Sequence, residues 1–140
     1  MRIVVDPEIK PDDFAVIRDA LYAYNDSRVD SPDGRLGVLL KDEADDTVGG
    51  LVAHWYYGWI FIELLFVPES ERGKDYGTSL IGEAERFAVS RGCTGAWLDT
   101  FSFQARGFYE KLGYTVFGEL PDYPVGHKRY FLSKRLASPA

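Results

Sequence analysis

The sequence is poor in several features that would direct it to a particular class of protein. It has one cysteine, Cys93, which excludes an internal disulfide framework and a metal site built from several cysteines. Its two histidines, His54 and His127, stand far apart and form no metal-binding motif, so no metal is expected. Lys and Arg number 16 against 22 Asp and Glu, for a net charge of −6. That balance argues against nucleic acid as a partner, because binding a phosphate backbone relies on clustered cations.

Long apolar segments are missing as well. The residues before Pro11 hold no run long enough for a signal peptide, and the longest apolar run, 55–62, ends at Glu63. That run is far shorter than the roughly 20 residues that a helix needs to cross a bilayer. The sequence therefore predicts a cytoplasmic protein with no membrane association.

What is present is a globular composition in a chain of 140 residues, of which 46% are hydrophobic and 15% aromatic. That length supports one core, so a single domain over residues 1–140 is expected. Hydrophobic periodicity predicts alternating elements without a linker or a repeat. The alternation indicates an α/β fold with a mixed, mostly antiparallel sheet of six to seven strands and helices on both faces. The predicted strands cover 2–5, 36–41, 47–57, 59–67, 96–100, 114–119 and 128–136, the predicted helices 11–25, 78–92 and 104–112, and turn chemistry fills 25–34.

The most distinctive segment is 60–82, IFIELLFVPESERGKDYGTSLIG. A strand that reads as buried leads through a charged turn into the loop Arg72–Gly77, and an amphipathic helix begins at Thr78. A glycine-bearing loop between a strand and a helix leaves several backbone N–H groups unpaired at the positive end of the helix dipole. The loop therefore predicts a binding site for a phosphate or pyrophosphate group.

A second motif lies at 102–114, SFQARGFYEKLGY, where Tyr109 follows Ala105 by four residues and a Gly-Tyr pair ends the segment. The loop Arg72–Gly77 is similar to an Arg/Gln-x-x-Gly-x-Gly/Ala motif. In this order and separation, the two motifs resemble those of the Gcn5-related N-acetyltransferase (GNAT) superfamily, and the order of elements matches across nearly the whole chain. The resemblance implies a GNAT-like fold, in which the strands 59–67 and 96–100 splay apart to admit acetyl-CoA as co-substrate.

The resemblance also assigns residues to the cofactor. The pantetheine arm would pair with the main chain of Phe66 and Val67, and the N–H near Leu65 would hold the thioester carbonyl and stabilise the oxyanion formed on attack. The pyrophosphate would lie on the N–H groups of the loop. The further residues assigned to the cofactor are Arg72, Gly73, Lys74, Asp75, Tyr76, Gly77, Thr78, Ser102 and Ala105.

Two positions depart from the family pattern. Asp75 stands where the family usually has the first Gly of a Gly-x-Gly pair; Asp tolerates a left-handed backbone and can cap a helix, but it brings negative charge near a pyrophosphate. Arg72 and Lys74 are expected to offset that charge. Ser102 stands where many members have Asn, and it offers one hydrogen-bond donor instead of two.

Tyr109 matches the family's tyrosine near the CoA sulfur, and the resemblance implies that it acts as the general acid for the departing thiolate. The alternative is that Tyr109 only packs the helix on the sheet, a role for which Phe108 is the better candidate.

The general base has two candidates. A substrate ammonium must lose a proton before attack, and Glu63 places a carboxylate within an otherwise apolar strand, where its burial is costly without a partner or a task. Strand parity gives Glu63 the face of Leu65 and Val67. Asp99, at the end of the strand 96–100, could serve instead or recognise the amine. For each carboxylate the alternative is an ion pair with a nearby Arg.

The function expected from the resemblance is direct transfer of acetyl from acetyl-CoA to a primary amine, on a small molecule rather than on a protein. The alternatives are a protein or peptide N-acetyltransferase and a module that senses acyl-CoA without turnover, which Asp75 and Ser102 would favour. Six aromatic residues could line an acceptor site, although core packing is the default for them: Trp55, Tyr56, Tyr57, Trp59, Phe101 and Phe103. His127 lies with Tyr123 in a late loop, where a substrate contact is expected. The resemblance leaves a homodimer open.

Overall fold

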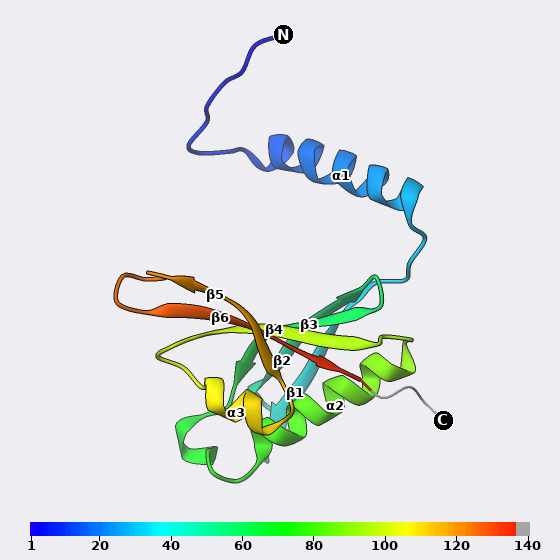
Figure 1. Ribbon diagram of the computed structural model, residues 1–140. Coiled ribbons are helices and arrows are strands. Elements are labelled where there is room, and N and C mark those ends of the chain that lie inside the picture. The colour runs from blue at the N-terminus through cyan, green and yellow to red at the C-terminus, as the bar shows by residue number, and fades with distance from the viewer. Residues whose placement is uncertain (137–140) are drawn as a thin grey trace. The chain divides into compact units, whose positions relative to one another are not determined.

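The structure, a computed structural model, describes residues 1–136 (Figure 1). Contacts divide it into two compact units, Met1–Ser31 and the chain from Pro32 onward. Each unit is described by itself, and the expectation of one domain over the whole chain stays a prediction.

The first unit consists of an extended segment and one helix, α1 (Pro11–Arg28). Proline at its first position, acidic residues in its first turn and Arg28 in its last turn all suit the helix dipole. No residue of α1 is buried. The apolar residues that predict the helix are all exposed, namely Phe14, Ile17, Leu21 and Tyr24.

Two expectations for this unit are wrong. Residues 2–5 form no strand, and Ile3 is fully exposed. Apolar, β-branched residues form a strand only when a neighbouring strand takes up their backbone hydrogen bonds, and none of the described residues does so here. The helix also continues past residue 25: the Val29 N–H donates to the Asn25 carbonyl at 2.9 Å, and the Ser27 hydroxyl donates to the Tyr24 carbonyl.

The second unit is built on a six-stranded mixed sheet with the order β1-β2-β3-β4-β6-β5. The pair β3–β4 is parallel and the other pairs are antiparallel, which confirms the predicted α/β class. The strands are β1 (Gly34–Lys41), β2 (Thr47–Tyr56), β3 (Trp59–Phe66), β4 (Gly95–Phe101), β5 (Thr115–Pro121) and β6 (Lys128–Arg135).

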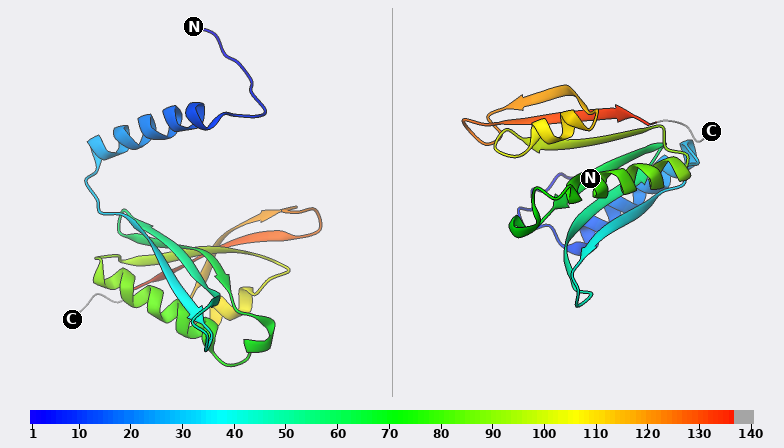
Figure 2. Two further views of the ribbon diagram at one scale, coloured as in Figure 1. Left: turned by 180° about the vertical axis from the view of Figure 1, so that it is seen from behind. Right: turned by 90° about the horizontal axis from the view of Figure 1, so that it is seen from below.

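Two helices cover one face of this sheet, α2 (Tyr76–Ser90) and α3 (Arg106–Lys111), with the short 3-10 turn η1 (Glu69–Glu71) before α2 (Figures 1 and 2). The core lies between the sheet and these helices, where burial of apolar surface supplies most of the stabilisation. Its members are Leu51, Ala53, Ile60, Ile62, Leu80, Ile81, Ala84, Ala88, Cys93, Ala96, Leu98, Tyr114 and Leu132.

The helices begin at other residues than the sequence predicts. α2 starts at Tyr76 instead of Thr78. α3 starts at Arg106 because the Gln104 side chain holds the bend before it: its Oε1 accepts hydrogen bonds from the Phe101 N–H at 2.8 Å and from the Thr100 hydroxyl at 3.1 Å. Within residues 1–136, no helix has the length and apolarity needed to span a membrane.

Candidate active site

The two central strands of the sheet separate part-way along their length. β3 and β4 are paired only from Trp59↔Gly95 to Ile62↔Leu98, although β3 continues to Phe66 and β4 to Phe101. Beyond the last pair, the main-chain groups of β3 that point toward β4 have no strand partner in the described chain. An extended ligand can therefore use them as it would use the edge of a sheet.

A β-bulge lies where the strands separate. Val52 pairs with Leu64 and Ala53 pairs with Ile62, so Glu63 is the extra residue on β3. The bulge breaks the alternation of the strand, and the expectation that parity gives Glu63 the face of Leu65 is therefore wrong. Glu63 is half-buried, and no described residue hydrogen-bonds or pairs with its carboxylate.

The loop before α2 presents a row of free donors. Ser79 is the first residue of this helix whose N–H bonds back along the chain, to the Asp75 carbonyl at 3.0 Å. The N–H groups of residues 73–78 have no acceptor among the described residues. They lie at the positive end of the α2 dipole, which is the arrangement that binds a phosphate.

Asp75 adopts a left-handed backbone conformation, which glycine takes most readily. Its φ is 65° and its ψ is 17°, and Gly73 two residues earlier has a φ of 81°. Asp75 thus takes the left-handed turn that opens the loop, at a cost that Asp bears better than most residues. Its carboxylate makes no capping hydrogen bond to α2.

The two cations expected to offset Asp75 have partners elsewhere. The Lys74 ammonium pairs with Glu71 at 2.9 Å, and the Arg72 Nε donates to the Val67 carbonyl at 3.0 Å. Arg72 thereby ties the loop to the end of β3, and its remaining guanidinium N–H groups stay available to an anion.

α3 packs beside the first turn of α2. A Cβ at Gly77 would lie 3.0 Å from the Phe108 ring, so glycine there lets the two helices approach. Tyr109 is half-buried, and its hydroxyl has no hydrogen-bond partner among the described residues. Burial raises the pKa of the Tyr109 phenol above its ordinary value, and the charge of Asp99 raises it further. The phenol therefore keeps its proton throughout the neutral range.

Asp99 is held by a residue that sequence reasoning did not single out. Arg129 on β6 forms a two-pronged ion pair with it, Nε to Oδ1 at 3.0 Å and Nη2 to Oδ2 at 2.9 Å. The third arm of the guanidinium donates to the Tyr123 hydroxyl at 2.9 Å. Of the two candidate bases, Asp99 thus has both oxygens engaged, whereas Glu63 has neither engaged by a described residue.

Ser102 faces the loop between β5 and β6. Its hydroxyl accepts a hydrogen bond from the Lys128 N–H at 3.0 Å and lies 3.2 Å from Nδ1 of His127. Ala105 is the exposed residue just before α3. No signal in the sequence shows these long-range pairings, because they depend on the register of β4 against β6.

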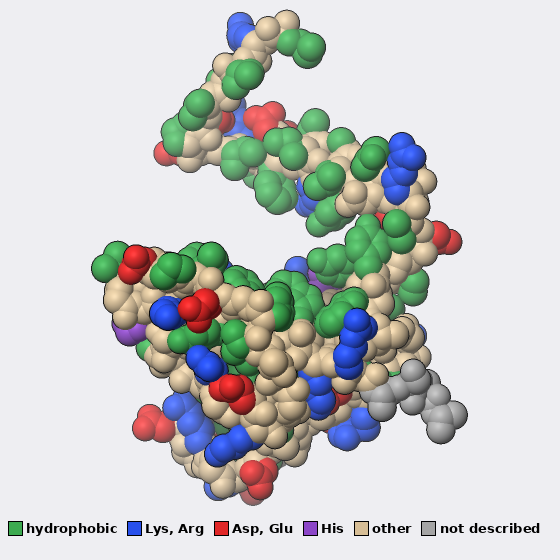
Figure 3. Space-filling model, in the orientation of Figure 1, with side chains coloured by type: hydrophobic (Ala, Val, Ile, Leu, Met, Phe, Trp, Pro, Cys, Tyr) green, Lys and Arg blue, Asp and Glu red, His purple; other side chains and the backbone are tan. Residues whose placement is uncertain are grey.

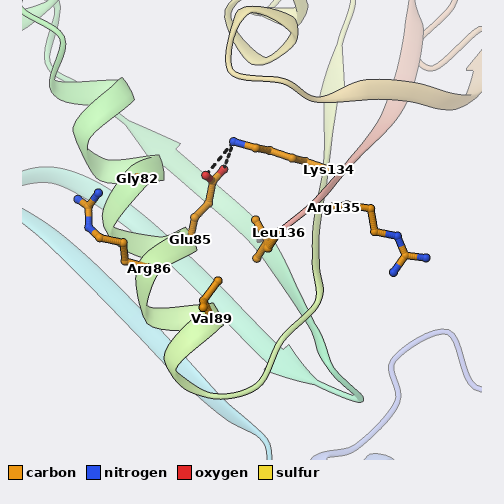
Figure 4. A pocket seen from close by; sticks show the side chains of 7 residues that line it. All are labelled: Gly82, Glu85, Arg86, Val89, Lys134, Arg135 and Leu136. Carbon is orange, nitrogen blue, oxygen red and sulfur yellow. Dashed lines mark hydrogen bonds and ion pairs between the residues drawn. The ribbon is translucent and has the colours of Figure 1, made fainter. Parts of the chain in front are cut away.

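A shallow hollow of about 450 Å³ lies elsewhere, between α2 and the end of β6. Figure 4 shows the ion pair on its wall, where Lys134 contacts both carboxylate oxygens of Glu85 at 2.9 and 3.2 Å. Glu85 also accepts a hydrogen bond from the buried Tyr114 hydroxyl. These side chains satisfy one another, and the hollow includes none of the free N–H groups of the loop, so it is not the candidate site.

The comparison with known families agrees with this geometry. The sequence profile of the acetyltransferase (GNAT) family matches residues 5–114, which span both motifs. The chain belongs to the GNAT acetyltransferase family. Members of this family use acetyl-CoA and an acceptor.

Individual GNAT relatives cover most of the chain. It is 40% identical over 120 residues to Acetyltransferase Atu2258 of Agrobacterium fabrum, covering 85% of this chain and 88% of that protein. It is 40% identical over 95 residues to Blasticidin-S acetyltransferase of Streptomyces morookaense, covering 67% and 70%. A crystal structure from Agrobacterium tumefaciens, assigned as an acetyltransferase, superposes with a TM-score of 0.88 at 36% identity, over 97% of this chain and all of that one.

Proposed function

We propose that the protein is an acetyl-CoA-dependent N-acetyltransferase that transfers acetyl directly to a primary amine of a small molecule. The observation that carries the proposal is the row of free N–H groups at residues 73–78, which opens beside the unpaired end of β3. A pyrophosphate on the row and a pantetheine arm along β3 would bring the thioester to the point where the strands separate.

The chemistry at that point uses three side chains. Glu63 takes a proton from the incoming ammonium, directly or through a water, because its carboxylate is free among the described residues. Tyr109, with its raised pKa, donates to the thiolate as the tetrahedral intermediate collapses. Asp99, held in place by Arg129, orients the acceptor. The main chain near Leu65 stabilises the oxyanion.

The small-molecule acceptor is supported by the Streptomyces relative, which is named as an acetyltransferase of blasticidin S. A second candidate function, binding of acyl-CoA without turnover, is favoured by one observation: Asp75 keeps a carboxylate beside the proposed pyrophosphate position. Asp75 nevertheless leaves the loop donors open, and a sensor would leave the unpaired phenol of Tyr109 without a task.

The proposal is tested by calorimetric titration of the protein with acetyl-CoA and with CoA, followed by release of free thiol with a panel of primary amines. We expect binding of both nucleotides and amine-dependent thiol release. Binding without release by any amine would favour the sensor. The absence of binding, both by the wild type and by Asp75→Gly, would overturn the proposal.

A further inference from the structure

An aromatic wall stands on the face of the sheet that α2 and α3 leave uncovered. It consists of Phe101 at the end of β4, Phe103 just beyond it and Tyr123 in the loop after β5. The Phe101 and Phe103 rings are stacked 5.2 Å apart and only 6° from parallel, and the Phe101 and Tyr123 rings are stacked 5.6 Å apart. Figure 3 shows hydrophobic side chains gathered on this side of the second unit.

Two polar residues, Arg129 and His127, contact the rings of the aromatic wall. The Arg129 guanidinium lies over the Phe101 ring at 5.5 Å and the Tyr123 ring at 5.0 Å, and it also forms the ion pair with Asp99. The His127 ring meets Phe103 edge-on at 5.0 Å, and His127 is in turn hydrogen-bonded to Ser102. The aromatic wall therefore already holds one planar cation, the guanidinium of Arg129, against two of its rings.

The position of the wall follows from the register of the sheet. β3 and β4 separate after Leu98, and Phe101 lies three residues farther along β4, a distance of about 10 Å. Phe101 thus stands across the opening from the part of β3 that follows Glu63. Phe103 is 57% exposed and Tyr123 is 43% exposed, which leaves large aromatic surfaces facing solvent beside the reacting position.

The charges at the opening determine how a ligand with a cationic end and an apolar end is oriented. Arg129 neutralises Asp99, so the carboxylate left without a described partner at the opening is that of Glu63. An ammonium is attracted to Glu63, and a flat apolar group is accommodated on Phe103 and Tyr123. We infer that the acceptor is a primary amine joined by a short chain to a planar aromatic or heteroaromatic ring, which stacks on the aromatic wall. The inference rests on the proposed acetyl transfer and names its substrate class.

The test compares two probes with the same ethylamine chain and a six-carbon ring, planar in 2-phenylethylamine and puckered in 2-cyclohexylethylamine, with acetyl-CoA as donor. Stacking predicts that kcat/KM favours the planar amine by about fivefold or more, chiefly through KM. Phe103→Leu, which keeps an apolar side chain, should reduce that preference to near unity. Phe117→Leu, an exposed aromatic on β5 outside the wall, should retain it. Thermal unfolding of both variants checks that the fold is intact.

The outcomes separate this inference from the function on which it rests. Equal kcat/KM for the two amines, or a preference that survives in Phe103→Leu, overturns the stacking wall and leaves acetyl transfer standing. Binding of acetyl-CoA with acetylation of neither amine overturns the substrate class. The absence of both acetyl-CoA binding and acetyl transfer overturns the proposed function, and the inference falls with it.

Discussion

The two faces of the sheet differ in what they offer at the point where β3 and β4 separate. On the face covered by α2 and α3, the candidate cofactor loop offers main-chain N–H groups from residues 73–78. On the open face, the aromatic wall offers side chains held by Arg129. A main-chain site tolerates a changed side chain as long as the backbone keeps its path, as Asp75 does with a φ of 65°. A site built from side chains changes its ligand preference when one of those side chains is substituted.

The faces are also stabilised differently. Between the sheet and the helices, Tyr114 is 2% exposed, and its hydroxyl donates a hydrogen bond to Glu85, which also pairs with Lys134. On the open face the Arg129 side chain is 26% exposed and works through several contacts at once. The helix-covered face is therefore anchored by a buried hydroxyl, whereas the open face depends on one cation.

The largest expected effect concerns Tyr109, the proposed general acid, which lies on α3. Tyr109→Phe removes the proton donor to the thiolate and should lower kcat by about 100-fold, the low end for general acid catalysis, with little change in acetyl-CoA affinity. Steady-state kinetics and calorimetry measure the two quantities. Tyr22→Phe on α1 makes the same chemical change at an exposed position and should leave both unaltered. A kcat within threefold of the wild type would give Tyr109 the packing role.

The next effect concerns Arg129 on the open face and the stability of the fold. Arg129→Gln leaves Asp99 without its partner in a mostly buried setting and should lower the free energy of unfolding by about 2 kcal/mol. Arg86→Gln, which loses only an exposed pair with Glu83, should cost less than about 0.5 kcal/mol. Urea unfolding of both variants measures the difference. Equal losses would show that the open face does not depend on its arginine.

A third effect concerns Tyr114 on the helix-covered face and the dependence of stability on pH. Burial first, and then the charge of Glu85, raises the pKa of Tyr114 well above its ordinary value. The folded protein therefore keeps this proton while the unfolded chain releases it above pH ~10, so the stabilisation is complete below that pH and is lost as pH rises further.

Tyr114→Phe tests that loss. The variant should be about 1 kcal/mol less stable at pH 7, because one hydrogen bond is gone. Between about pH 10 and 11.5, the unfolding free energy of the variant should fall less steeply with pH than that of the wild type. The two slopes should differ by up to ~1.4 kcal/mol per pH unit. Denaturant unfolding at several alkaline pH values measures both slopes. Parallel slopes would contradict the shifted phenol.

The smallest effect concerns Asp75. Asp75→Asn removes the charge and keeps a side chain that tolerates the left-handed turn, and Asp75→Gly also removes the backbone strain. Both variants should bind acetyl-CoA a few-fold more tightly than the wild type, because each removes a negative charge near the proposed pyrophosphate position. The loss of that charge from the N-terminal end of the α2 dipole should lower the free energy of unfolding by roughly 0.5 kcal/mol. Weaker binding by both would mean that the carboxylate contributes to the site.

Local rules account for what the sequence determined by itself. The strand-loop-helix order around residues 72–78, the helix that carries Tyr109 and the mixed sheet all follow from periodicity, glycine placement and turn chemistry, which act over a few neighbouring residues. The two motifs together predicted the family. The strand expected at 2–5 failed because a strand exists only through its neighbour, and local sequence does not supply one.

Only the tertiary structure decided how distant residues meet. The bulge at Glu63 depends on the register of β2 against β3, and one inserted residue changes which face a side chain takes. The pairing of Asp99 with Arg129 depends on the register of β4 against β6, across 30 residues of sequence. Register is set by the packing of a whole face of the sheet, so it leaves no signal in any single segment. The free main-chain donors of the loop could therefore be predicted from the local sequence. The partners of side chains such as Asp99 could be identified only from the tertiary structure.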